Sequence, residues 1–427
     1  MRVFGFLLLA AALSAILFGL APALQATRLD VAQATKGEFR ADVRPVRFRN
    51  ALTLGQIVAC AMLLTCKVQS LRVSARMGAQ DVGFATSGIL GLNVNEKYRS
   101  RVLSQLAAEP SVRAIAAAQS IPLNGRLGSV PVIGGERHTV RAAYNFVSPD
   151  FFRALDISIR SGRSFSQTEA QSGAAVAIVS QKTAEQLWPG QQALGQTLQI
   201  APEPRIGPES KVRRFPSVRI IGVATDVVSC CMSTGVDPAL VYLPTTSAAP
   251  GTGLLVRVYG NSERARKDLD TKLAAISPSA IDQIHTMETF QAAGIFPFRV
   301  VAAVCTVIGG LALLLALSGV YGVLSFSVSQ RTREIGIRMA IGASTASVAG
   351  MVIKQSMRLA LPGSVAGAVL ALGVCRLLAS RLFFMKLFEP IAFLTGVVVP
   401  LAAAAVAAYV PAHRAPSVEP TNALRHD

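Results

Sequence analysis

Three long apolar runs in the C-terminal third constrain this chain more than any other feature. They cover Val300–Ser327, Leu359–Leu378 and Ile391–Val410, and none of them contains Asp or Glu. A helix needs about 20 predominantly apolar residues to cross the hydrocarbon core of a bilayer, so each run is long enough. The sequence therefore predicts three membrane-spanning helices within residues 298–413.

A short basic segment, residues 331–344, separates the first two runs. Its Arg331, Glu334 and Arg338 share one helical face, and Ile335 lies on the adjoining apolar face. An amphipathic helix between two spans must lie at a membrane surface. Periodicity alone leaves two interpretations open: a positive-inside anchor loop, or a helix that contacts a partner protein.

The N-terminal run, residues 1–24, is either a signal peptide or a retained span. It is longer than the 7–15 residues typical of a signal-peptide core. Its exit, residues 21–36, also matches residues 410–425 in register, with Pro22 aligned to Pro411. Such a repeat favours a retained helix, the last one of a preceding membrane unit.

A second early run, Ala51–Cys66, is short for a span and is closed by Lys67. We predict a transmembrane helix over residues 51–68. The linker 25–50 carries a basic excess, which marks it as cytoplasmic. Alternation of the spans then places residues 69–297 outside the cytoplasm and the tail 414–427 inside.

The region between the second and third spans is predicted to be a mixed α/β domain. Short apolar or β-branched runs predict strands, and longer amphipathic runs predict helices. The predicted strands are Gly88–Val94, Ala174–Val179, Val218–Val223, Ala239–Leu243 and Gly253–Val258. The predicted helices are Glu96–Glu109, Asp150–Leu155, Gln181–Leu187 and Ser262–Ile276, and Pro202–Pro208 is predicted to be a loop.

The sequence carries no signature of enzymatic, metal or nucleic-acid chemistry. The net charge is +18, but the basic residues concentrate beside apolar runs, where they orient spans in the membrane. The phosphate-binding pattern G-x-x-x-x-G-K-[ST] is absent, and the four histidines lack metal-ligand spacing. The predicted spans contain no carboxylate for a proton relay. We expect no catalytic activity, no cofactor, no metal and no nucleic-acid partner.

Segment 331–344 resembles the cytoplasmic motif of FtsX/MacB-type ABC transporter permeases. Several blocks of the insert are similar to the MacB-like periplasmic core: residues 144–152, 162–165, 175–180, 188–190, 194–196, 220–226 and 242–244. The repeated exit motif also resembles permeases of the acidobacterial duplicated type, which hold two FtsX units in one chain. The resemblance implies an α-helical protein of the bacterial inner membrane with a large α/β extracytoplasmic domain at 69–297.

The resemblance further implies a partner and a role. Permeases of this family pair with a separate ATPase, and a coupling helix between two of the spans contacts it. Carried over to this chain, the coupling residues are Arg331, Arg333, Glu334, Ile335, Gly336, Arg338 and Gly342. Membrane lipid, a homodimer or a second FtsX unit, and a periplasmic adaptor are further expected partners.

Two functions from different classes remain open. The first is a permease subunit that exports or extracts a hydrophobic or amphipathic compound. The alternative is a transmembrane signal transmitter that regulates a periplasmic partner such as a cell-wall hydrolase, or else a truncated, inactive permease. Within the predicted span Leu359–Leu378, Gly363 and Gly367 form a small-residue stripe that either seats a neighbouring helix or is a chance pattern in a Gly/Ala-rich helix.

Overall fold

A computed structural model describes residues 43–414, except 126, 136–137, 202–210, 231, 233–234, 237–238, 331–333, 335–336, 338–340, 342–343 and 380–387. Contacts between residues divide the chain into two compact units. Among the described residues, the membrane unit comprises 43–65, 305–371 and 391–414, and the α/β unit comprises 66–304 and 372–390. The predicted first span and the Pro202–Pro208 loop lie outside the described residues.

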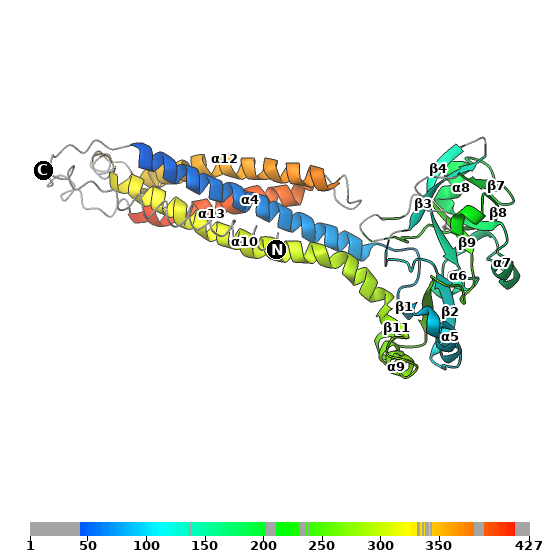
Figure 1. Cartoon of the computed structure of the whole chain (residues 1–427). Helices are drawn as coiled ribbons and strands as arrows, with labels where there is room; N and C mark the ends of the chain where they lie inside the picture. The colour runs from blue at the N-terminus through cyan, green and yellow to red at the C-terminus, as the bar shows by residue number, and fades with distance from the viewer. Residues whose placement is uncertain are drawn as a thin grey trace. The chain divides into compact units, whose positions relative to one another are not determined.

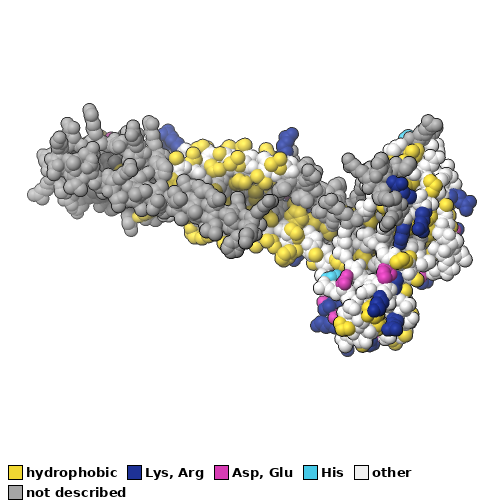
Figure 2. Space-filling view, in the orientation of Figure 1, with side chains coloured by type: hydrophobic (Ala, Val, Ile, Leu, Met, Phe, Trp, Pro, Cys, Tyr) yellow, Lys and Arg dark blue, Asp and Glu magenta, His cyan; other side chains and the backbone are white. Residues whose placement is uncertain are grey.

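Within the described residues, four long helices are apolar and long enough to cross a membrane (Figure 1). They are α4 (Val43–Ala79), α10 (Met287–Gln330), α12 (Thr345–Ala379) and α13 (Pro390–Arg414). The last three contain the three apolar runs from which the spans were predicted. Figure 2 shows apolar side chains gathered on the exposed surface of these helices, as lipid contact requires.

The predicted second span, residues 51–68, lies within α4, and the helix extends beyond it at both ends. The helix continues through Lys67 to Ala79. The sequence-based length was too short because it followed the apolar run, which Lys67 closes. The helix continues because Val73 and Met77 are buried in the α/β unit, so packing replaces lipid as the environment of its apolar face.

Helix α10 also begins earlier than the predicted span, at Met287, and it contains Pro297. The prediction treated Pro297 as the end of the soluble region. Proline removes one hydrogen bond from a helix and disfavours its interior, but tertiary packing overrides this local preference. Here the preceding turn is fixed by the buried side chain of Ile295.

The membrane unit has its own core, in which small residues predominate. Its buried side chains come from all four helices: Ile57, Ala316, Val320, Leu324, Val352, Ala360, Ala404, Ala407 and Ala408. Alanines at these positions allow the helix backbones to approach each other closely, as in other membrane bundles.

The α/β unit is built from two lobes, and the first is a four-stranded antiparallel sheet with two helices. Its strand order is β11-β1-β10-β2. The chain order is β1 (Ile89–Val94), η2 (Glu96–Tyr98), α5 (Arg99–Ala107), β2 (Val112–Ala118), β10 (Gly253–Val258), α9 (Ser262–Ala274) and β11 (Ile281–Thr286). Two βαβ halves in this order form a ferredoxin-like lobe.

The second lobe is inserted between β2 and β10. It contains β3 (Gly128–Gly134), β4 (His138–Val147), α6 (Phe151–Leu155), β5 (Ile159–Gly162), α7 (Gln167–Ser172), β6 (Val176–Ser180), α8 (Gln181–Leu187), β7 (Thr197–Ile200), η3 (Lys211–Arg214), β8 (Ser217–Ala224) and β9 (Leu240–Pro244). Strands pair in the order β4-β3-β7-β8-β6-β9, and β9 pairs back onto β4. The six strands therefore close into a ring, which we call the barrel lobe.

All five predicted strands and all four predicted helices are present, within a few residues of the predicted ends. The mixed α/β fold class is therefore confirmed. Strands β2, β3, β4, β5, β7 and β11 and helix α7 were not predicted.

Candidate functional site

A buried apolar cluster lies between the two lobes, and the ends of two membrane helices complete it. We call it the junction core. Its members include Val73 and Met77 of α4, Phe151, Phe152 and Leu155 of α6, Tyr242 of β9, and Met287 and Ile295 of α10. These helix ends belong to the α/β unit, and the cluster packs them against both lobes.

Alternation along the strands explains why the sheet has two apolar faces. In β1, Ile89 belongs to the junction core, whereas Leu90 packs under α5 and α9 in the ferredoxin-like lobe. In β9, Tyr242 faces the junction core and Val241 faces the inside of the barrel. Successive side chains of a strand point to opposite faces, so one strand serves two cores.

The last turns of α4 are fixed in the junction core. Val73 and Met77 are 1% and 0% exposed, and their four-residue spacing places them on one helical face. Full burial of such side chains stabilises a fold by about 1.5–3 kcal/mol each. The end of α4 therefore moves with the α/β unit.

The first turns of α10 are fixed in the same way. Met287 and Ile295 are buried, and the ring of Phe290 packs against His285 at a centroid distance of 5.1 Å. A Cβ atom on Gly294 would lie 3.1 Å from Met232, so the helix backbone lies directly against this residue. The C-terminal end of α4 and the N-terminal end of α10 are thus both buried in the α/β unit.

The linker from α4 to β1 is held by backbone hydrogen bonds. The amide of Ala85 donates to the carbonyl of Leu155, and the amide of Val228 donates to the carbonyl of Val82, at 2.8 and 2.9 Å. Gly83 has φ +81°, and a Cβ there would lie 2.5 Å from the carbonyl oxygen of Asp226. A side chain at this position would clash with that carbonyl and would strain the backbone, so the close approach requires glycine.

A pocket of about 550 Å³ opens beside this linker. Three carboxylates and one guanidinium line it, from Asp81, Asp156, Asp226 and Arg160. Two of the carboxylates cap backbone amides: Asp81 accepts from Gly83, and Asp226 accepts from Lys182 at the start of α8. The carboxylates of Asp81 and Asp226 therefore stabilise the backbone of the linker and the start of α8.

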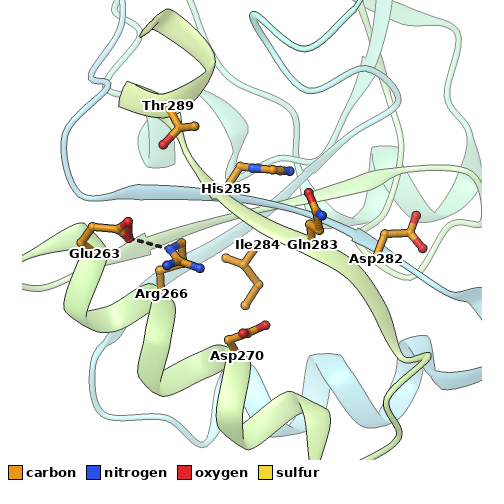
Figure 3. A pocket seen from close by; sticks show the side chains of 8 residues that line it. All are labelled: Glu263, Arg266, Asp270, Asp282, Gln283, Ile284, His285 and Thr289. Atoms are coloured by element: carbon orange, nitrogen blue, oxygen red, sulfur yellow. Dashed lines mark hydrogen bonds and ion pairs between the residues drawn. The ribbon is translucent and has the colours of Figure 1, made fainter. Parts of the chain in front are cut away.

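A second pocket, of about 390 Å³, lies between α9 and the edge strand β11 (Figure 3). Glu263 and Arg266 on α9 form an ion pair at 2.5 Å, while Asp270 and Asp282 add negative charge. Among the residues that the structure describes, no group of His, Cys, Asp and Glu side chains is arranged to hold a metal ion. The lining of this pocket is charged, which does not suit a hydrophobic ligand.

The predicted coupling segment is described at only a few positions. Glu334 lies on a helical turn and is exposed, whereas Arg331, Arg333, Ile335, Gly336, Arg338 and Gly342 lie outside the described residues. The amide of Ser347 donates to Oγ of Ser344 at 3.3 Å, which caps the start of α12. The role of the segment stays a prediction.

Gly363 and Gly367 of α12 both lie against α4. A Cβ atom on Gly367 would lie 2.5 Å from the carbonyl oxygen of Val58 and 2.6 Å from Cβ of Ala61. A Cβ on Gly363 would lie 2.9 Å from Cγ2 of Ile57. This geometry supports the proposal that the stripe seats a neighbouring helix.

Sequence reasoning missed the junction core. The available signal was the apolar pair Val73 and Met77 at helical spacing beyond Lys67, which indicates that the helix continues into a protein environment.

Comparisons with known proteins agree with this architecture. The model of the MacB-like periplasmic core domain matches residues 51–283, and that of the FtsX-like permease C-terminal region matches residues 306–420. The uncharacterized ABC transporter permease YknZ of Bacillus subtilis (strain 168) is 26% identical over 369 residues, which cover 78% of this chain and 86% of YknZ.

The macrolide export ATP-binding/permease protein MacB of Escherichia coli (strain K12) is 26% identical over 306 residues. These cover 67% of this chain but 44% of MacB, so the chain spans less than half the length of this relative. Among solved structures, the periplasmic region of MacB from Actinobacillus actinomycetemcomitans aligns with a TM-score of 0.36 and 13% identity, over 51% of this chain and 97% of that one.

The periplasmic-core model alone covers more than half of the chain, and the FtsX-like model covers most of α10, α12 and α13. The chain therefore belongs to the FtsX/MacB type of ABC transporter permeases and is a multi-pass membrane protein with a MacB-like periplasmic domain.

Proposed function

We propose that this permease works with a separate ABC ATPase in the bacterial inner membrane. ATP hydrolysis by that subunit changes the conformation of the periplasmic domain, and this change exports or extracts a hydrophobic or amphipathic compound. The junction core is the observation that carries the proposal. Because the ends of α4 and α10 are buried in it, a movement of either helix in the membrane acts on both lobes.

Segment 331–344 is the proposed contact with the ATPase. It connects the end of α10 to the start of α12, and Glu334 is exposed within it. An exposed charge on a short helical turn is available for pairing with another protein. The basic residues Arg331, Arg333 and Arg338 add further polar contacts in this proposal.

The exposed surface of the membrane helices is apolar and suits contact with further partners. Large apolar side chains such as Val307, Leu314 and Val369 are more than half exposed. They suit lipid, a second copy of the chain or another FtsX unit. A periplasmic adaptor that contacts the periplasmic domain is also part of the proposal.

A second candidate function is the transmission of a signal to a periplasmic protein. The two pockets beside β11 and the α4–β1 linker favour it, because charged side chains line both. A transmitter uses the same movement of α4 and α10 but needs no apolar cavity for a substrate.

Charge reversals in segment 331–344 test the contact with the ATPase. We expect Glu334→Lys and Arg338→Glu to weaken co-purification of the ATPase with the tagged permease, because each replaces an attractive interfacial charge by a repulsive one. Membrane insertion should be unchanged. Ile335→Asp serves as a comparison, because it should instead displace the segment from the bilayer surface.

The co-purification result decides the role of the segment, and a transport assay decides between the two functions. If both reversals retain the ATPase as well as the wild type, the segment is an anchor loop and the coupling proposal fails. ATP-dependent uptake of a hydrophobic fluorescent dye into inside-out vesicles then separates the two functions, since only an export permease should produce it.

A further inference from the structure

A buried carboxylate directly precedes α13 and meets two arginines of α4. The Glu389 side chain is 8% exposed, and its Oε2 accepts a hydrogen bond from Nη2 of Arg76. Nη1 of Arg72 lies 3.6 Å from Oε1 of the same carboxylate. Arg72 and Arg76 are four residues apart, so both guanidinium groups lie on one face of α4. We call these three residues the α4–α13 clamp.

The surroundings of Glu389 make these partners necessary. Glu389 stands next to Pro390, the first residue of α13, and its other neighbour, Phe388, is 58% exposed. A buried carboxylate that lacks a partner loses its solvation without compensation, and this is especially unfavourable beside a membrane span. The start of a helix also favours a negative charge. Glu389 is therefore held between α4 and the beginning of α13.

Nη1 of Arg76 is buried and lacks a hydrogen-bond partner within the described part of the chain. Arginine and carboxylate groups form two parallel hydrogen bonds when their planes align. A small shift of α13 relative to α4 can therefore add a second bond from Arg76. Arg72, whose side chain is 41% exposed, can exchange its contact for water.

We propose that Glu389 is a positioning residue that links the movement of α13 to that of α4. The inference rests on the proposed function, in which α4 carries movement to the periplasmic domain. Arg76 lies between Val73 and Met77, both of which are buried in the junction core. A displacement of α13 that pulls on Arg76 therefore reaches the junction core within one helical turn.

The test uses the full permease in complex with its ATPase in nanodiscs. Hydrogen–deuterium exchange of residues 73–79 is measured without nucleotide and with ATP plus vanadate. We expect the wild type to show a nucleotide-dependent difference and Glu389→Gln to lose it, since glutamine keeps the shape but removes the charge. The exchanged pair Arg76→Glu with Glu389→Arg should recover the difference. Lys67→Gln, which removes a charge from α4 outside the clamp, should behave as wild type.

Failure of the clamp inference and failure of the proposed function give different results in this experiment. If the wild type itself shows no difference, the proposed function fails and the inference fails with it. If the wild type shows the difference and Glu389→Gln retains it, only the clamp is wrong. Loss in Glu389→Gln without recovery in the exchanged pair assigns Glu389 a purely structural role and also overturns the inference. Unchanged exchange in β6 and β8 verifies that each variant is folded.

Discussion

Two glycines of α12 illustrate how single residues determine the packing of the membrane unit. Gly363 and Gly367 face α4. At Gly367 the two helices are so close that a side chain would clash with the backbone of α4. Two other glycines of the same helix, Gly350 and Gly373, have no neighbouring atom within 4 Å of a Cβ position. The four positions share one helix but differ in their surroundings, which makes them matched test sites.

We predict that Gly367→Ala destabilises the membrane unit whereas Gly350→Ala does not. The added methyl group at Gly367 forces α4 and α12 apart, and overpacking of this kind costs about 1–3 kcal/mol. At Gly350 the helix propensity of alanine dominates, with a gain of up to about 1 kcal/mol. Thermal unfolding in detergent measures both effects. A melting temperature of Gly367→Ala equal to that of Gly350→Ala would contradict the close packing.

In the periplasmic domain, Glu169 provides a test that depends on pH. Its carboxylate accepts hydrogen bonds from both Nη atoms of Arg163, at 2.6 and 2.8 Å, and also caps α7 through the amide of Ser166. The Arg163 guanidinium is the main reason that the pKa of Glu169 is lowered from 4.5 to about 2. A carboxyl group whose pKa is lowered by folding stabilises the folded state above its unfolded pKa, and this contribution is lost as the pH falls.

Glu169→Gln should therefore lower the melting temperature at pH 7, and the gap to the wild type should narrow between pH 4.5 and pH 2. Glutamine still caps the helix, so the variant isolates the charge. Melting curves of both proteins at pH 7 and pH 3 provide the comparison. A gap of constant size would show that the ion pair with Arg163 contributes no stability.

At the scale of elements, the central feature is that α4 is one helix from Val43 to Ala79. Its apolar part belongs to the membrane unit, and its last turns belong to the junction core. A continuous helix transmits displacement along its axis because each turn is hydrogen-bonded to the next. Leu71, which lies between the two parts and is 47% exposed, is a suitable position at which to interrupt it.

Leu71→Pro should break α4 while leaving both cores intact. Proline removes a helix hydrogen bond and clashes with the preceding turn, at a cost of about 3 kcal/mol, whereas Leu71→Ala preserves the helix. Limited trypsin digestion should then cut after Lys67 or Arg72 in the proline variant only. Equal digestion of the two variants would mean that α4 is already interrupted near Leu71.

The elements also show which parts of the fold the sequence can reveal. Strand β10 was predicted from its short apolar run, and this run is continuous because Leu255 packs on one face of the sheet and Leu254 and Val256 pack on the other. Strand β2 reads VRAIAAA, and its alanines resemble those of a helix, so it was missed. Barrel closure depends on pairing of β4 with β9, which no local pattern indicates.

Contacts between residues far apart in the chain are the part of the structure that local sequence patterns could not predict. Arg76 and Glu389 are 313 positions apart in the chain, and nothing in the local sequence of either residue specifies the other. The coupling residues and Gly363 and Gly367, by contrast, were proposed from local spacing and composition. Those proposals stay predictions until variants are measured.

For the whole molecule, the predicted topology assigns each region to one side of the membrane. We predict that Ser172→Cys, in a variant without the six native cysteines, reacts with a membrane-impermeant maleimide in spheroplasts. Glu334→Cys should react only after the inner membrane is opened. Both positions are exposed, so access to the reagent depends on the membrane. Labelling in the reverse order would invert the topology derived from the basic linkers.

In the proposed mechanism, the state of the ATPase reaches the periplasmic domain through α4 and α10. Hydrogen–deuterium exchange of residues 73–79 and 287–295 in the permease–ATPase complex tests it most directly, because local stability determines amide protection. Addition of ATP plus vanadate should change exchange in both segments of the wild type, whereas Leu71→Pro, which interrupts α4 alone, should lose the change in residues 73–79. Identical exchange with and without nucleotide in a complex that hydrolyses ATP would contradict the account.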